Sequence, residues 1–148
     1  MDYQNTLTYL YNSVPMFQQV GGSDYKEGLE NTKVLDEHFG HPHRSFHSIH
    51  VAGTNGKGSC SHTLAAILQE AGYRVGLYTS PHLIDFRERI RINGQPVPEE
   101  YVVRFVENER SFFEPLHPSF FELTTAMAFC YFADEKVDVA IIEVGLGG

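Results

Sequence analysis

The residues best suited to chemistry form a glycine-rich segment, Gly53-Thr54-Asn55-Gly56-Lys57-Gly58-Ser59. It follows an apolar stretch, Ser48 to Ala52, and precedes residues with helical periodicity, Ser59 to Ala71. In a strand-to-helix turn, glycines let backbone N–H groups face phosphate oxygens, and the helix N-terminus and a lysine add positive charge. A hydroxyl at the helix start, such as that of Ser59, can help to hold Mg²⁺. The segment therefore predicts a phosphate-binding loop.

The spacing of this loop differs from the common pattern G-x-x-x-x-G-K-[ST]. The first glycine lies three residues before Gly56, and Gly58 separates Lys57 from Ser59. The alternative interpretation is a glycine-rich turn that holds no ligand. We favour the binding loop because a lysine buried in such a turn needs an anionic partner.

Two further residues lie where a metal-binding group would serve such a loop. Glu143 is near the end of an apolar stretch, Val137 to Val144, and Ser80 follows another, Arg74 to Tyr78. Ligands of open α/β sheets bind outside the carboxyl ends of the strands, so we expect both residues near the loop, able to hold Mg²⁺. Taken alone, a glutamate at a strand end is more often a solvated or capping residue, and Thr79-Ser80-Pro81-His82 is an ordinary Ser-Pro turn. The phosphate loop is what favours the metal site.

The histidines and cysteines favour no second metal site. Five histidines cluster in a short stretch, namely His38, His41, His43, His47 and His50. Their spacing fits no tetrahedral zinc site, no cysteine lies among them, and they span a helix end, a proline loop and a strand. We interpret them as ordinary core and surface residues. Cys60 and Cys130 form no CxxC pair, which favours reduced thiols.

Hydrophobic periodicity and turn residues predict the elements that position these groups. Helices are expected within 3–20, ending near Pro15, and at Leu29–Phe39, Ser59–Ala71, from Pro98 onward and at Phe121–Ala133, with a loop at 21–28. Strands are expected at Ser48–Ala52, Arg74–Tyr78 and Val137–Val144, and a hairpin at Glu88–Val97 around Asn93-Gly94. The inward positions of two helices are expected to be Leu29, Val34, Leu35 and His38, and Leu64, Ile67, Leu68 and Ala71.

The order strand, glycine loop, helix and strand over residues 48–78 describes a βαβ unit with parallel strands. The last strand is apolar on both faces, which is typical of a central parallel strand. The sequence therefore predicts the α/β fold class: a mostly parallel sheet that contains a phosphate loop and is flanked by helices.

Composition narrows the classes of function. The 148 residues correspond to about one domain. A net charge of -8 makes the chain a poor candidate for broad binding of nucleic acid or anionic membranes. Neither a membrane span nor a secretory signal is visible. We therefore expect a soluble cytoplasmic protein with no nucleic-acid or membrane partner.

Five ordered segments resemble the folylpolyglutamate synthase / dihydrofolate synthase family, a branch of the Mur ligase superfamily. They are Val51–Ser59, Tyr78–Leu83, Arg87–Gly94, Phe120–Thr125 and Glu143–Gly148. The resemblance extends over essentially the whole chain, and the extra glycine after the loop lysine is typical of that branch. It implies a Mur ligase-like central ATPase domain, of which residues 1–148 would be an incomplete, N-terminal portion without the family's C-terminal domain.

The resemblance also implies the site residues. ATP phosphates would bind at Gly53, Thr54, Asn55, Gly56, Lys57, Gly58 and Ser59, with Lys57 neutralising charge during catalysis. Mg²⁺ would be held by Ser80 and Glu143. The pterin or folate would lie near Phe120, Phe121 and Glu122 and near the loop around Gly28 and Leu29. A further metal-binding histidine and a modified lysine of the family would lie downstream.

The implied reaction joins dihydropteroate or a folate such as tetrahydrofolate to L-glutamate at the expense of ATP. The substrate carboxylate takes the γ-phosphoryl group to become an acyl phosphate, which the glutamate amine then attacks. Mg²⁺ and Lys57 would offset the charge on the transferring group. The full-length enzyme is expected to be a monomer, and this chain a fragment without turnover of its own. Two alternatives stay open: a ligase of peptidoglycan precursors, and a nucleotide-binding remnant without catalysis.

Overall fold

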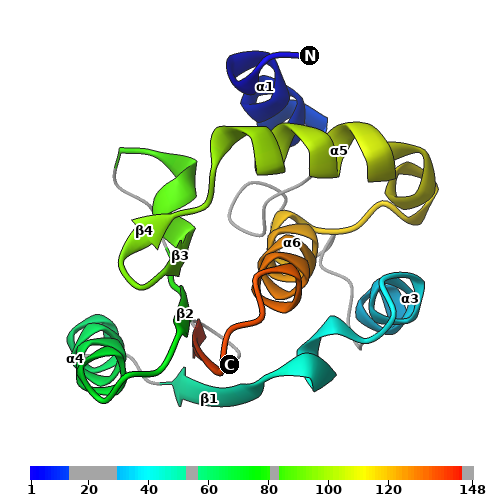
Figure 1. The fold of residues 1–148 in the computed structure, drawn as a ribbon. Coiled ribbons are helices and arrows are strands. Elements are labelled where there is room, and N and C mark those ends of the chain that lie inside the picture. The colour runs from blue at the N-terminus through cyan, green and yellow to red at the C-terminus, as the bar shows by residue number, and fades with distance from the viewer. Residues whose placement is uncertain (14–29, 53–56, 81–83, 145–148) are drawn as a thin grey trace. The chain divides into compact units, whose positions relative to one another are not determined.

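A computed structural model describes residues 1–13, 30–52, 57–80 and 84–144 (Figure 1). The chain divides into two compact units, each of which is described by itself. The helical unit comprises Met1–His41 and Glu99–Met127, and the sheet unit comprises Pro42–Pro98 and Ala128–Gly148. The proposed phosphate loop and both proposed metal-binding residues fall in the sheet unit.

The helical unit contains the α-helices that the apolar periodicity predicts, together with a short 3₁₀ helix that it does not predict. They are α1 (Tyr3–Ser13), α3 (Glu30–His38), α5 (Glu99–Phe113), the short 3₁₀ helix η4 (Glu114–Leu116) and the first part of α6 (Phe120–Asp134). α5 buries Val102, Phe105, Val106 and Phe113, and α1 contacts α5.

In α3 only part of the expected inward face is buried. Leu35 is buried, as expected. Val34 is 40% exposed and His38 is exposed as well, so their inward prediction is wrong. Val34 lies about 100° around the helix from Leu35, and in α3 this rotation takes it out of the buried face. Gly40 follows the helix with φ +76°, the left-handed conformation expected of a glycine at a helix C-terminus.

Within the residues that the structure describes, the sheet unit is built on five strands. Its elements are η2 (Pro42–Ser45), β1 (His47–Ala52), α4 (Lys57–Glu70), β2 (Val75–Tyr78), η3 (Phe86–Arg89), β3 (Ile90–Ile92), β4 (Gln95–Pro96) and β5 (Val139–Val144). The strand order is β1-β5-β2-β3-β4. β5 pairs in parallel with β1 and β2, which confirms the central place predicted for it.

The predicted hairpin becomes the antiparallel edge of the same sheet. β3 pairs with β2 and with β4, so the sheet is mixed. Asn93 and Gly94 both have positive φ, 48° and 81°, as a two-residue hairpin turn with the twist of the strands requires. The first strand begins at Ile90 rather than at Glu88, so that boundary was wrong: Glu88 and Arg89 belong to η3.

Helix α4 connects β1 to β2 and covers one face of the parallel strands. Leu64, Ala65 and Leu68 pack against an apolar cluster of the two central strands, formed by Val75, Leu77, Val139 and Ile141. Ile67 is 59% exposed and Ala71 is exposed as well, so their inward prediction is wrong. The face that meets the sheet is centred on Leu64, Ala65 and Leu68 instead. Gly72, at φ +96°, ends the helix as predicted, and Tyr73 N–H donates to Leu68 O at 3.1 Å.

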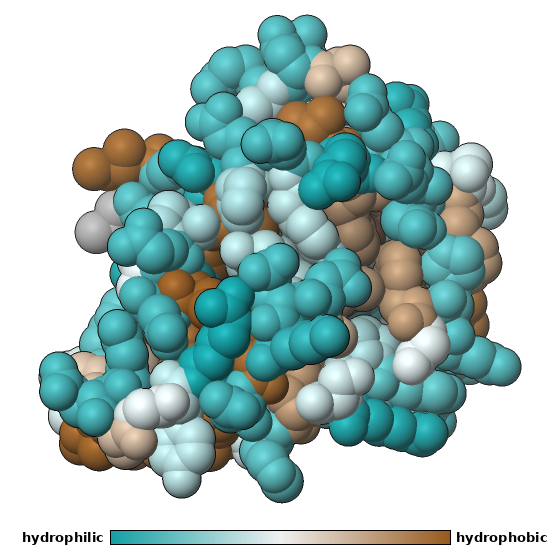
Figure 2. Space-filling model, in the orientation of Figure 1, coloured by the Kyte–Doolittle hydropathy of each residue, from teal (hydrophilic) through white to brown (hydrophobic). Residues whose placement is uncertain are grey.

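Scattered apolar side chains remain on the surface among polar ones. Figure 2 shows such hydrophobic areas within a largely hydrophilic face. The large apolar side chains that are exposed in the sheet unit include Ile67, Tyr73 and Ile84, and Ile84 is 91% exposed. Among the helices in the described ranges, none is long and apolar enough to cross a membrane.

The sheet tolerates no side chain at one position of β2. A Cβ placed on Gly76 would lie 2.8 Å from the ring of Phe132 on α6. We predict that Gly76→Ala lowers the free energy of unfolding by about 1–3 kcal/mol, the usual cost of overpacking a core. Chemical denaturation measures this, with Gly76→Ala/Phe132→Leu as the rescue variant. Unchanged stability of Gly76→Ala, or no recovery in the double variant, would contradict the close contact.

Candidate functional site

The carboxyl ends of three parallel strands meet at one edge of the sheet unit. Ala52, the last residue of β1, pairs with Val144, and Val51 pairs with Glu143. On the other side of β5, Tyr78 pairs with Ile142. Ser80, two residues beyond Tyr78, and Glu143, one residue beyond Ile142, therefore reach the same edge. This is the edge at which open α/β sheets bind ligands.

Helix α4 begins at this edge. Its first residue is Lys57, only five positions after the end of β1. The predicted start at Ser59 was two residues late, because Lys57 and Gly58 belong to the first turn. The N-terminus of a 14-residue helix carries free N–H groups and the positive end of the helix dipole. Gly53–Gly56 lie outside the described residues, and Ser59 is exposed in the first turn.

Glu143 is buried at the end of an otherwise apolar strand. Its residue is 3% exposed. Side chains alternate along a strand, and Val139 and Ile141 face α4, so Glu143 points to the same face as that helix. The carboxylate is therefore placed on the side of the sheet where α4 begins.

Ser80 is half-buried in the segment that follows β2. Its neighbour Thr79 donates its N–H to Arg89 O at 3.0 Å, which extends the pairing with the β3 side by one residue beyond the strand. Pro81, His82 and Leu83 lie outside the described residues.

The donor chemistry of these residues fits a magnesium ion. Mg²⁺ prefers oxygen ligands, binds through one or two carboxylates and completes its octahedron with water and substrate phosphates. A carboxylate from Glu143 on β5 and a hydroxyl from Ser80, two residues beyond the neighbouring β2, supply this kind of donor set.

The segment predicted to bind the pterin or folate opens helix α6 in the helical unit. Phe120 is 3% exposed and stacks on Tyr11 with ring centroids 5.6 Å apart. Glu122 accepts the Ser119 N–H at 2.7 Å, and Ser119 Oγ accepts the Glu122 N–H at 3.0 Å, which is a capping box. Phe121 is 48% exposed and is the member of this trio most open to a ligand. Gly28 and Leu29 lie outside the described residues.

The clustered histidines have structural partners. His38 Nε2 lies 2.8 Å from Glu109 Oε2, and its ring stacks on Phe112. His41 Nδ1 lies 2.6 Å from Asp36 Oδ2. Within the described part of the chain, no group of three or more His, Cys, Asp or Glu side chains could hold a metal ion. The contacts of His38 and His41 are those of ordinary structural residues.

Comparison with known proteins finds relatives of this chain. No family model matches the chain. A dihydrofolate synthase/folylpolyglutamate synthase of Bacillus subtilis is 46% identical over 130 residues, which cover 83% of this chain and 30% of the relative. The crystal structure of a folylpolyglutamate synthase from Thermotoga maritima matches with a TM-score of 0.86 and 46% identity, over 99% of this chain and 34% of that one. This chain belongs to the folylpolyglutamate synthase and dihydrofolate synthase family.

The chain spans about a third of the length of these two relatives. A solved complex of FPGS with AMPPCP and folate also matches, with a TM-score of 0.84 and 37% identity, over all of this chain and 36% of that one. The resemblance stated from the five sequence segments is thereby confirmed, as is the α/β fold expected from it.

The family resemblance does not identify the turn η3, whose Arg89 O accepts the N–H of Thr79, next to Ser80. Asp85 and Glu88 form a capping box at the start of η3, and Arg89 is buried in that turn. The pattern Asp-x-x-Glu was available as a signal in the sequence. The alternating residues from Glu88 onward favour a strand and so obscure this pattern.

A hollow of about 490 Å³ lies in the helical unit of this family member. It is lined by Met1, Tyr9, Arg110, Phe113, Glu114, His117 and Pro118. Tyr9 Oη donates to Glu114 Oε1 at 2.5 Å, and Arg110 lies 4.5 Å from the centre of the Tyr9 ring. Arg110 Nε also donates to Glu114 at 3.1 Å. These three side chains satisfy one another and join α1 to the end of α5.

Burial, the hydrogen bond to Glu114 and the charge of Glu114 raise the pKa of Tyr9 to about 12, against an opposing effect of Arg110. The folded pKa lies above the unfolded value of about 10. The contribution of the protonated Tyr9 to the free energy of unfolding is therefore complete below pH 10 and is lost as the pH rises to about 12. We predict that Tyr9→Phe removes the last part of the tyrosinate absorbance titration. Glu114→Gln should move that part to lower pH, and an unchanged titration in both variants would contradict the contact.

Proposed function

We propose that this chain carries the magnesium–nucleotide site of an ATP-dependent ligase. The ligase would form an amide bond between the carboxylate of dihydropteroate or a folate and the amine of L-glutamate. The observation that carries this proposal is the buried Glu143 at the end of the central strand, level with the end of β1 that leads into α4. It is supported by the similarity to an FPGS that has been solved with AMPPCP and folate.

The nucleotide phosphates would lie over the N-terminus of α4. Backbone N–H groups of the segment Gly53, Thr54, Asn55, Gly56, Lys57, Gly58 and Ser59 would surround them, and Lys57 would supply a positive charge. Ser80 and Glu143 would hold Mg²⁺. When bound, the ion neutralises charge that develops on the phosphoryl group.

The reaction would proceed by activation and then displacement. A carboxylate oxygen of the pterin-containing substrate attacks the γ-phosphorus of ATP, and the bond from that phosphorus to the bridging oxygen of ADP breaks. The glutamate nitrogen then attacks the acyl carbon, loses a proton, and expels phosphate. Lys57 stabilises the negative charge of the transferring group by position and charge alone, so no nucleophilic side chain is needed.

The pterin or folate would contact the start of α6 and the loop around Gly28 and Leu29. Of the three residues expected at α6, Phe121 offers an exposed aromatic face on which a flat heterocycle can stack. Phe120 and Glu122 would act through the core and through the helix cap. Because the substrates would be ATP, L-glutamate and folates, we place the complete enzyme in the cytoplasm. We also propose that it is a monomer with no nucleic-acid partner.

We predict that Mg-ATP raises the melting temperature of this chain, because a ligand that binds only the folded state stabilises it by mass action. At a concentration 100 times Kd the gain is about 2.7 kcal/mol, which corresponds to several degrees in a domain of this size. Differential scanning fluorimetry measures the shift. Lys57→Ala should abolish the shift. Lys33→Ala, a change at an exposed position of α3, should leave the shift intact.

Removal of the metal provides the second arm of this experiment. Excess EDTA should reduce the shift, and Glu143→Gln should make the shift insensitive to Mg²⁺. A parent chain that melts cooperatively with no shift at millimolar Mg-ATP would contradict the proposed function. An equal loss in Lys57→Ala and Lys33→Ala would contradict the assignment of the loop.

A further inference from the structure

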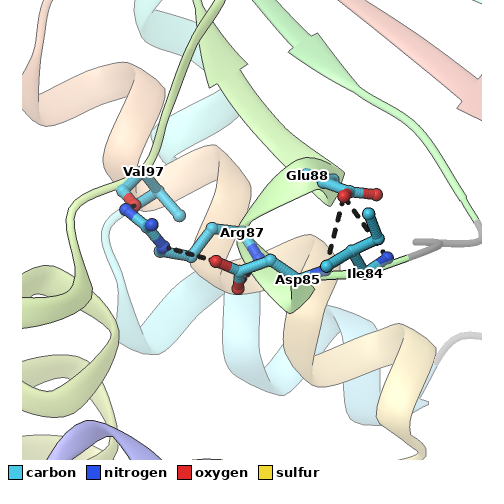
Figure 3. Close-up of polar contacts among 5 residues, drawn as sticks. All are labelled: Ile84, Asp85, Arg87, Glu88 and Val97. Atoms are coloured by element: carbon cyan, nitrogen blue, oxygen red, sulfur yellow. Dashed lines mark hydrogen bonds and ion pairs between the residues drawn. The ribbon is translucent and has the colours of Figure 1, made fainter.

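The segment that carries Ser80 is fastened on both sides to one short turn, η3. On its N-terminal side, Thr79 donates its N–H to Arg89 O at 3.0 Å. On its C-terminal side, Ile84 and Asp85 both donate their N–H groups to Glu88 Oε2, at 3.3 Å each (Figure 3). Thr79, next to Ser80, and Ile84, four residues beyond it, thus depend on two consecutive residues of the same turn.

The turn is well suited to act as a fixed support. Asp85 Oδ1 accepts the Arg87 N–H at 3.1 Å, and Glu88 N–H donates to Asp85 O at 2.9 Å. Arg87 in turn reaches Asp85 Oδ2 at 3.1 Å and Val97 O at 3.4 Å, as Figure 3 shows. Phe86 and Arg89 are 1% and 7% exposed, so the turn is anchored in the sheet unit by burial as well as by hydrogen bonds.

The carboxylate of Glu88 does more than close a capping box. A capping box needs only the N–H of the N-cap residue, here Asp85, but Glu88 also accepts the N–H of Ile84, one residue outside the box. Ile84 is 91% exposed, so its side chain adds almost no packing to hold this part of the backbone. The Glu88 carboxylate thus holds the backbone at the start of η3, the turn whose Arg89 O accepts the N–H of Thr79, next to Ser80.

We propose that Glu88 is a positioning residue that sets the place of Ser80 at the magnesium–nucleotide site. This inference rests on the proposed function, because Ser80 is assigned there as a magnesium ligand. Glu88 acts through backbone N–H groups and touches neither nucleotide nor metal. Its contribution should therefore appear as a dependence of nucleotide affinity on Mg²⁺, which a general loss of stability would not produce.

The test compares Glu88→Ala, Glu88→Gln and the matched control Glu70→Ala, a change at the exposed end of α4. Isothermal titration measures the Kd for ADP with and without Mg²⁺. Glu88→Ala should raise the Kd about tenfold with Mg²⁺ and change it less than twofold without. Glu88→Gln should restore the parent value, since an amide oxygen accepts the same two N–H groups. Glu70→Ala should match the parent in both conditions.

Amide hydrogen exchange gives a readout that needs no ligand. In Glu88→Ala the N–H groups of Ile84 and Asp85 should exchange about tenfold faster, while those of β5 keep their parent rates. Parent rates at Ile84 and Asp85, or an equal loss of ADP affinity with and without Mg²⁺, would overturn the positioning role and leave the proposed function standing. A parent chain that binds no Mg-ADP would overturn both.

Discussion

The parallel register of β1, β5 and β2 is the constraint on which the proposed site depends. Because Ala52 pairs with Val144 and Tyr78 with Ile142, three segments remote in sequence end at one edge. A shift of β5 by one residue relative to its neighbours would turn Glu143 to the opposite face of the sheet. The register is stabilised by the apolar cluster under α4, so the packing of Leu64 and Leu68 also determines where the carboxylate points.

Folding and chemistry make opposite demands on β5. The strand is buried between two neighbours, and an apolar residue at each position would stabilise it most. A carboxylate in such a place lowers stability relative to an apolar side chain of similar size. The proposed role of Glu143 as a magnesium ligand would account for a carboxylate at this position. Figure 1 shows β5 between β1 and β2, the position from which one side chain can serve both neighbouring strand ends.

The sequence predicted those parts of the fold that depend on local periodicity and turn chemistry. The βαβ unit, the Asn93-Gly94 hairpin and the central place of β5 follow from such patterns and are confirmed. Errors arose where burial depends on distant partners. Ile67 fits the helical stripe, yet the sheet meets α4 at Leu64, Ala65 and Leu68. Glu88 fits a strand pattern, yet its carboxylate caps a turn. The nucleotide site could be proposed from residue types alone. The role of η3 could be proposed only from the hydrogen bonds that the structure shows.

The central claim is that the ends of three parallel strands form one magnesium–nucleotide site. The most direct test replaces Mg²⁺ with paramagnetic Mn²⁺ in the presence of ADP and records the loss of amide signals by NMR. If the claim is correct, the amides of Ala52, Ser80 and Val144 lose intensity first, and those of His47 and Val139, at the opposite ends of β1 and β5, lose it last. Loss of signal in the helical unit with the strand ends unchanged would contradict it.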